Sequence, residues 1–69
     1  MYGIDIEIYD HNGKYLRSEM HDEVFEHFSD AQRELLQPTK VRRIAYTPDG
    51  HRLILSDWDY NYILTIVEL

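Results

Sequence analysis

Four histidines and a surplus of carboxylates are the residues of this chain whose types suit metal binding or proton transfer. Glu23 precedes His27 by four residues, a spacing that brings two side chains together on a helix. His21 lies roughly 240° from His27 around such a helix, so the two histidines cannot bind one ion from the same face. We therefore expect an exposed Glu–His pair, with no metal site and no cofactor.

Serines, histidines and carboxylates also supply the residue types of catalytic triads. No nucleophile elbow, glycine-rich phosphate loop or zinc-protease motif places them together. A chain of 69 residues also leaves little room for a walled substrate pocket. The sequence therefore predicts a protein that is not an enzyme and has no catalytic residues.

An acidic arc is the most distinctive pattern in the sequence. With residues placed about 100° apart on a helix, the acids of residues 19–34 fall on one side, interrupted only by Arg33. Over about 22 Å they approach the linear charge density of one DNA strand. The candidate partner-binding residues are Glu19, Asp22, Glu23, Glu26, Asp30 and Glu34. The alternative is a solvated face that only keeps a small protein soluble.

A second candidate surface surrounds Trp58, which lies between Asp57 and Asp59 in an expected turn. The flanking acids make full burial of the indole unfavourable, and exposed Trp and Tyr side chains commonly anchor protein interfaces. Tyr60 and Tyr62 follow in the same segment. These three aromatic residues are an alternative partner-binding site. Core packing is the other role open to all three, and it is favoured for the two tyrosines.

Charge restricts the class of partner. Thirteen acids and seven bases give a net charge of −6, and residues 1–37 carry nine of the acids but three of the bases. Such a field repels nucleic acid and anionic membranes and favours basic protein surfaces. No apolar run approaches bilayer length, cysteine is absent, and residues 1–10 do not resemble a signal peptide. We expect a cytoplasmic protein that does not bind nucleic acid or membranes directly.

One amphipathic helix over residues 20–37 is predicted to carry the acidic arc. Its apolar stripe comprises Met20, Val24, Phe28, Ala31 and Leu35, and Pro38 is expected to end it. The sequence Ser-Asp-Ala-Gln at residues 29–32 also fits a capping box, which would split the segment into two helices at Phe28. We expect one helix, because the stripe passes through this point without losing phase.

Strands are predicted on both sides of the helix. Residues 2–9 alternate apolar and polar, an Asn-Gly turn follows, and residues 14–18 form a short edge strand. Residues 41–47 and 51–56 form a hairpin, and residues 60–69 are apolar on both faces, as expected of a central strand. The sequence predicts a single α+β domain over residues 1–69. It consists of a small antiparallel sheet of four to five strands, in the order ββαβββ, packed against one amphipathic helix.

The segment RIAYTPDGHRLIL at residues 43–55 resembles the inner hairpin of a blade in WD40-type propellers, where a Pro-Asp-Gly turn joins two such strands. A propeller requires several four-stranded blades, which a chain of this size cannot supply. The resemblance therefore implies a hairpin at this position, without the propeller fold.

The leading interpretation is a small acidic binding protein that occupies a basic, nucleic-acid-binding surface of a partner protein. Its most concrete form is an inhibitor of the type that phages use against host defence or in host takeover, with the acidic helix face as a nucleic-acid mimic. The alternative is a structural or regulatory interaction module that acts through residues 60–69 and the Trp58 turn as a homodimer. Strong salt dependence is expected of the first mechanism and little of the second.

Overall fold

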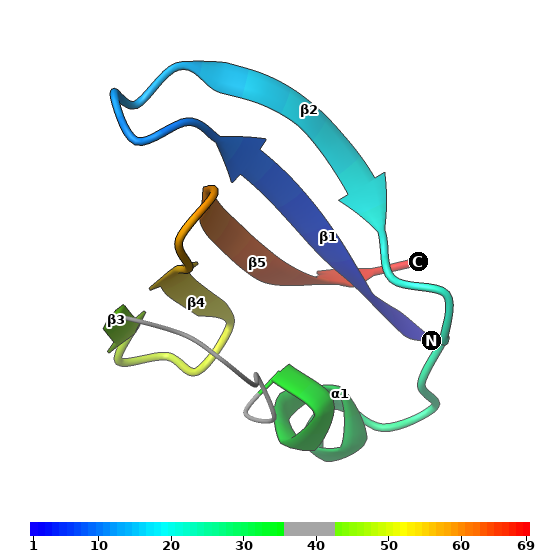
Figure 1. Cartoon of the computed structure of the whole chain (residues 1–69). Coiled ribbons are helices and arrows are strands. Elements are labelled where there is room, and N and C mark those ends of the chain that lie inside the picture. The colour runs from blue at the N-terminus through cyan, green and yellow to red at the C-terminus, as the bar shows by residue number, and fades with distance from the viewer. Residues whose placement is uncertain (36–42) are drawn as a thin grey trace.

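A computed structural model describes residues 1–35 and 43–69, and in these ranges the chain forms a sheet and one helix (Figure 1). The elements follow one another in the order ββαβββ, which confirms the predicted α+β class with an antiparallel sheet and one helix. Their bounds are β1 (Tyr2–Tyr9), β2 (Tyr15–Met20), α1 (Phe28–Leu35), β3 (Arg43–Tyr46), β4 (Arg52–Ser56) and β5 (Asn61–Glu68).

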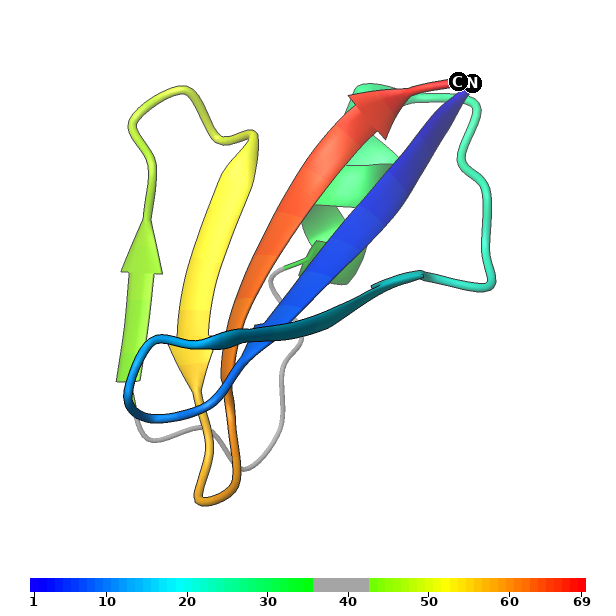
Figure 2. The ribbon, with the colours of Figure 1, turned by 90° about the horizontal axis from the view of Figure 1, so that it is seen from above.

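The described strands form a five-stranded sheet in the order β2-β1-β5-β4-β3, with every neighbouring pair antiparallel. β5 is central, as its two apolar faces predicted, and β2 is an edge strand, also as predicted. The chain ends come together beside this centre, where the Leu69 amide donates to the Met1 carbonyl at 2.9 Å (Figure 2). The first and last strands of the sequence therefore form the middle of the sheet.

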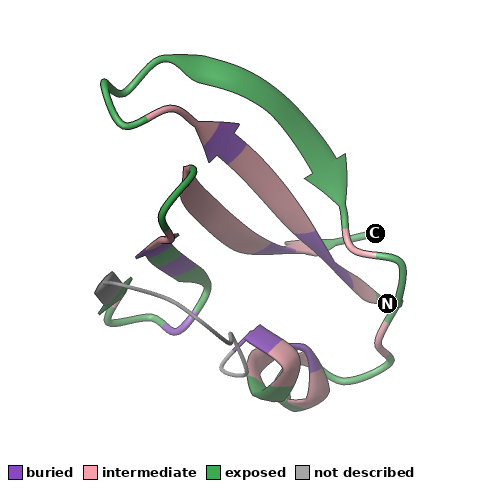
Figure 3. Cartoon of the chain, viewed as in Figure 1, coloured by how far each residue is buried: buried purple, intermediate pink, exposed green. Residues whose placement is uncertain are grey.

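One face of the sheet packs against α1 and forms the core. Side chains alternate along each strand, so Ile4 pairs with Ile66 on this face and Ile6 with Leu64. Figure 3 shows the consequence: buried positions lie on α1 and on the strands that face it, whereas β2 is exposed along its whole length. The buried cluster consists of Ile4, Ala31, Leu35, Leu53, Leu55 and Ile66.

Polar turns that contain a glycine close the β1–β2 and β3–β4 hairpins. The Asp10 carboxylate accepts hydrogen bonds from the backbone amides of Asn12 and Lys14, both at 2.9 Å. Gly13 follows with φ of 87°, and Gly50 in the second turn has φ of 73°, a region that side chains disfavour. The predicted turn chemistry at both sites therefore matches the structure.

The expectation of one helix from Met20 is wrong. Met20 belongs to β2, where it pairs with Asp5, and the segment 21–27 connects β2 to α1. Phe25 and Tyr2 exchange two backbone hydrogen bonds, of 2.7 and 2.8 Å, so β1 rather than a helical turn satisfies these groups. A helix does begin at Phe28, where the alternative split was expected, but no helix precedes it.

The apolar stripe is correspondingly shorter than predicted. Ala31 and Leu35 are buried and Phe28 is half-buried, stacking edge-on against Tyr2 with ring centroids 5.6 Å apart. Val24 is 51% exposed and does not belong to the core. The predictions for residues 36–42, including the helix end at Pro38 and the start of the third strand, lie outside the described residues.

Candidate binding surfaces

The predicted acidic residues do not share one helix face. Glu19 lies on β2, where its carboxylate accepts a hydrogen bond from the Arg17 side chain at 2.9 Å. Asp22, Glu23 and Glu26 lie in the connecting segment 21–27, and α1 carries the other two, Asp30 and Glu34. The surface formed by segment 21–27 and α1, here called the loop–helix surface, thus holds five of the six candidates.

A shallow groove of about 380 Å³ runs between the two parts of this loop–helix surface. Three carboxylates line it from both sides, those of Glu26, Asp30 and Glu34. Val24 and Phe25 add apolar atoms to its wall. The groove therefore combines negative charge with an apolar wall, the two properties that suit a Lys or Arg side chain with its aliphatic stem.

One side-chain contact joins the two parts of the loop–helix surface, and a second lies within α1. His21 Nε2 lies 3.3 Å from Glu34 Oε1, which ties the start of the connecting segment to the last turn of α1. Arg33 Nη1 lies 3.3 Å from Asp30 Oδ1, one helical turn earlier. Both pairs are partly exposed, so each adds little to stability. Their acids remain open to competition from a partner's basic groups.

The expected Glu–His pair on a helix is wrong, because Glu23 and His27 both lie in the connecting segment. The Glu23 amide instead donates a hydrogen bond to His21 Nδ1 at 3.1 Å. Within residues 1–35 and 43–69 no three His, Asp or Glu side chains gather closely enough to hold a metal ion. No helix in these ranges is long and apolar enough to cross a bilayer.

The turn between β4 and β5 is built around the Asp57 carboxylate. It accepts hydrogen bonds of 2.8 Å from the amides of Asp59 and Tyr60 and from the Tyr62 hydroxyl. Partial desolvation raises the pKa of Asp57, but the hydrogen bonds outweigh it and hold the pKa below its ordinary value. This contribution to stability is present above the ordinary carboxyl pKa and is lost as pH falls through the lowered one.

Trp58 and the tyrosines of this segment divide between surface and core. Trp58 is 75% exposed, and its carbonyl oxygen lies 3.1 Å from His11 Nε2. This contact links the two turns, and no local sequence pattern predicts it. Tyr62 packs against the core, and Tyr60 meets its ring edge-on. β1 and β4 pair with both edges of β5, so contacts through residues 60–69 would have to use side chains.

Tyr62→Phe is expected to lower the free energy of unfolding by about 1 kcal/mol at pH 7, because one hydrogen bond to Asp57 is lost. Burial and this hydrogen bond raise the pKa of Tyr62 to about 12, above the value of about 10 in an unfolded chain. The neutral phenol therefore stabilises the fold below pH 10, and the benefit disappears as pH rises to 12. Urea unfolding at pH 7 and 11 should show the difference between wild type and variant shrinking; a constant difference would contradict the assignment.

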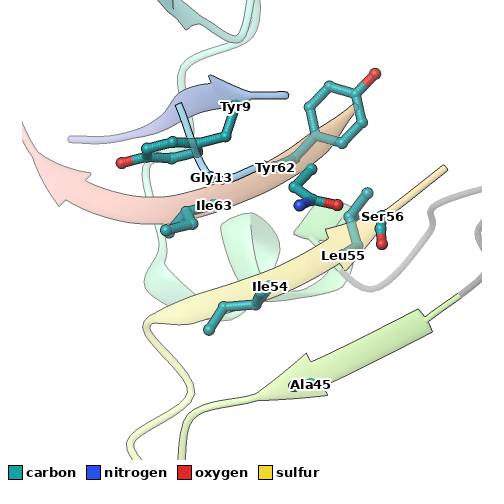
Figure 4. A pocket seen from close by; sticks show the side chains of 9 residues that line it. Tyr9, Gly13, Ala45, Ile54, Leu55, Ser56, Tyr62 and Ile63 are labelled. Carbon is teal, nitrogen blue, oxygen red and sulfur yellow. The ribbon is translucent and has the colours of Figure 1, made fainter. Parts of the chain in front are cut away.

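A second hollow, of about 290 Å³, lies on the sheet face turned away from α1 (Figure 4). Tyr9, Ile54 and Ile63 line it from three different strands, together with Ala45. No sequence motif marks this site, because its residues are far apart in the chain. Alternation along β4 and β5 could have indicated this site, since it places the paired apolar residues Ile54 and Ile63 on the uncovered face.

Comparison with protein-family models found no match, and searches of curated proteins and solved structures likewise found no similar protein.

Proposed function

We propose that this protein is a small acidic binding protein whose loop–helix surface binds Lys and Arg side chains of a basic protein partner. The observation that supports the proposal is the groove in which Glu26, Asp30 and Glu34 face an apolar wall. A guanidinium or ammonium group can pair with the carboxylates while its stem covers Val24.

Charge distribution favours the same partner class. The net charge is −6, and segment 21–27 with α1 carries five acids against the single base Arg33. Such a field speeds association with a basic surface and makes the complex sensitive to salt. A partner that uses the same basic surface for nucleic acid would be inhibited by competition, which is the form of the mechanism that we favour.

Reversing two groove charges provides the test. The double variant Glu26→Lys/Asp30→Lys is expected to bind a fluorescent peptide rich in lysine and arginine about tenfold more weakly than wild type. Fluorescence anisotropy at two salt concentrations measures the affinity and its salt dependence. Circular dichroism confirms that the variant is folded.

A charge-matched control separates site binding from net charge. Asp5→Lys/Asp59→Lys changes the net charge by the same amount, but Asp5 lies on the uncovered sheet face and Asp59 in the β4–β5 turn. This control should bind the peptide more tightly than the groove variant. Equal losses in both variants would mean that net charge alone attracts the peptide, and the proposal would fail.

The exposed Trp58 supports a second candidate surface. Binding through the groove predicts that Trp58→Ala leaves the affinity for the basic peptide unchanged. A loss of affinity in Trp58→Ala, with full affinity in the groove variant, would place the binding surface at the β4–β5 turn instead.

A further inference from the structure

The outer edge of β2 is unpaired among the residues that the structure describes. Within residues 1–35 and 43–69 only β1 pairs with β2, and every side chain of β2 is exposed. Tyr15, Leu16 and Met20 are apolar yet 40–51% exposed. Exposed edges with apolar side chains are templates for pairing with another strand.

Backbone geometry shows which groups β2 presents outward. The His21 amide donates to the Ile4 carbonyl at 2.9 Å, so His21 points its backbone groups toward β1. Because bonding alternates along an antiparallel ladder, Arg17 and Glu19 also point inward. Ser18 and Met20 therefore present their amide and carbonyl groups to the outside.

We propose that a second copy of this chain pairs with β2, antiparallel, about a two-fold axis at Ser18. In this register the outward-pointing Ser18 residues of the two copies face each other and can exchange both backbone hydrogen bonds. Arg17 of each copy lies opposite Glu19 of the other. Side chains directly opposite one another share a face of the sheet, so the opposite charges meet.

The neighbouring registers are disfavoured by charge. The nearest registers in which outward-pointing residues still pair with each other are shifted by two residues. These shifts move the two-fold axis from Ser18 to Arg17 or to Glu19. The first shift places Arg17 against its own copy and the second places Glu19 against its own copy, and like charges directly opposite are destabilising. The register at Ser18 thus pairs opposite charges where these two shifts pair like charges.

The same charges limit pairing with other strands. Arg17 and Glu19 on an edge discourage partners that lack matching charges, but a second copy supplies the match. The edge lies on β2, whereas the groove lies between segment 21–27 and α1, so this proposal does not depend on the proposed function.

A pair of charge variants tests the register. The variant Arg17→Glu has an acid at residue 17 and at residue 19, and the variant Glu19→Arg has a base at both of these positions. Each variant alone should dimerise about tenfold more weakly than wild type, because both cross-strand pairs become repulsive. An equimolar mixture should form a heterodimer, since every pair is then of opposite charge. Sedimentation equilibrium of each protein and of the mixture measures these constants.

Two controls complete the experiment. The double variant Arg17→Glu/Glu19→Arg restores opposite charges and should dimerise like wild type. Ser18→Pro removes an outward amide, which an edge strand tolerates, and should give a folded monomer. A wild-type protein that stays monomeric at millimolar concentration would overturn the proposal. So would single charge variants that dimerise as well as wild type, because the contact would then lie elsewhere.

Discussion

Leu53→Ala is expected to remove more than half of the protein's free energy of unfolding at 25 °C. Leu53 is fully buried at the centre of the core, where it pairs with Leu64 across the sheet. Removing a buried leucine side chain to the β-carbon costs about 3 kcal/mol or more through lost burial and a residual cavity. A chain of this length has a total stability of about 5 kcal/mol, so more than half would be lost. Urea unfolding followed by circular dichroism measures the change.

The next residue provides the matched control for Leu53. Ile54 lies on the same strand with its side chain on the uncovered face and is 43% exposed. Ile54→Ala is expected to cost less than about 1 kcal/mol, because little apolar surface returns to water. If Ile54→Ala were as damaging as Leu53→Ala, the assignment of the two sheet faces would be incorrect.

Leu35→Ala is expected to destabilise the protein by about 3 kcal/mol. Leu35 is 2% exposed. Leu35 and Ala31 are the buried residues through which α1 contacts the buried face of the sheet. Loss of this side chain would weaken the attachment of the helix, and with it the groove that depends on α1. Thermal unfolding gives the stability, and amide exchange in α1 shows whether the helix detaches first.

The stability of Val24→Ala distinguishes the observed core from the core that helical periodicity predicts. A helix over residues 20–37 would place Val24 in the same buried stripe as Leu35, and the two alanine variants would then have similar costs. The structure places Val24 in the connecting segment with half of its surface exposed. We therefore expect Val24→Ala to cost under about 0.5 kcal/mol. A cost similar to that of Leu35→Ala would favour the longer helix.

Most of the sheet could be predicted from local sequence. Alternation in residues 2–9 identifies β1 and its buried face, and the Asn-Gly and Pro-Asp-Gly sequences identify turns. The two apolar faces of residues 60–69 predict the central position of β5. These signals are reliable because the two faces of a strand, a turn, and a strand buried on both faces each correspond to a pattern within a few consecutive residues.

The start of the helix could not be predicted in the same way. Residues 20–27 fit a helical stripe, but β1 offers their backbone an alternative set of hydrogen bonds through Ile4 and Tyr2. The capping-box sequence at residues 29–32 indicated a break at Phe28, where the helix does begin, although Ser29 itself lies within α1 and not before it. This capping signal competed with a periodic pattern, and only pairing with a distant strand decided between them.

The candidate site also has some properties that follow from local sequence and others that depend on tertiary structure. Sequence by itself determined that the protein is acidic, that its acids cluster in the first half, and that Trp58 lies in a polar turn. These properties follow from the composition and from the order of neighbouring residues, without knowledge of the fold. Tertiary structure alone decided that Glu19 lies on an edge strand while Glu26, Asp30 and Glu34 line one groove. The physical reason is that β1 has two edges: β5 occupies one, and β2 with the segment after it pairs along the other. That pairing replaces the first half of the predicted helix and exposes a new edge at Ser18.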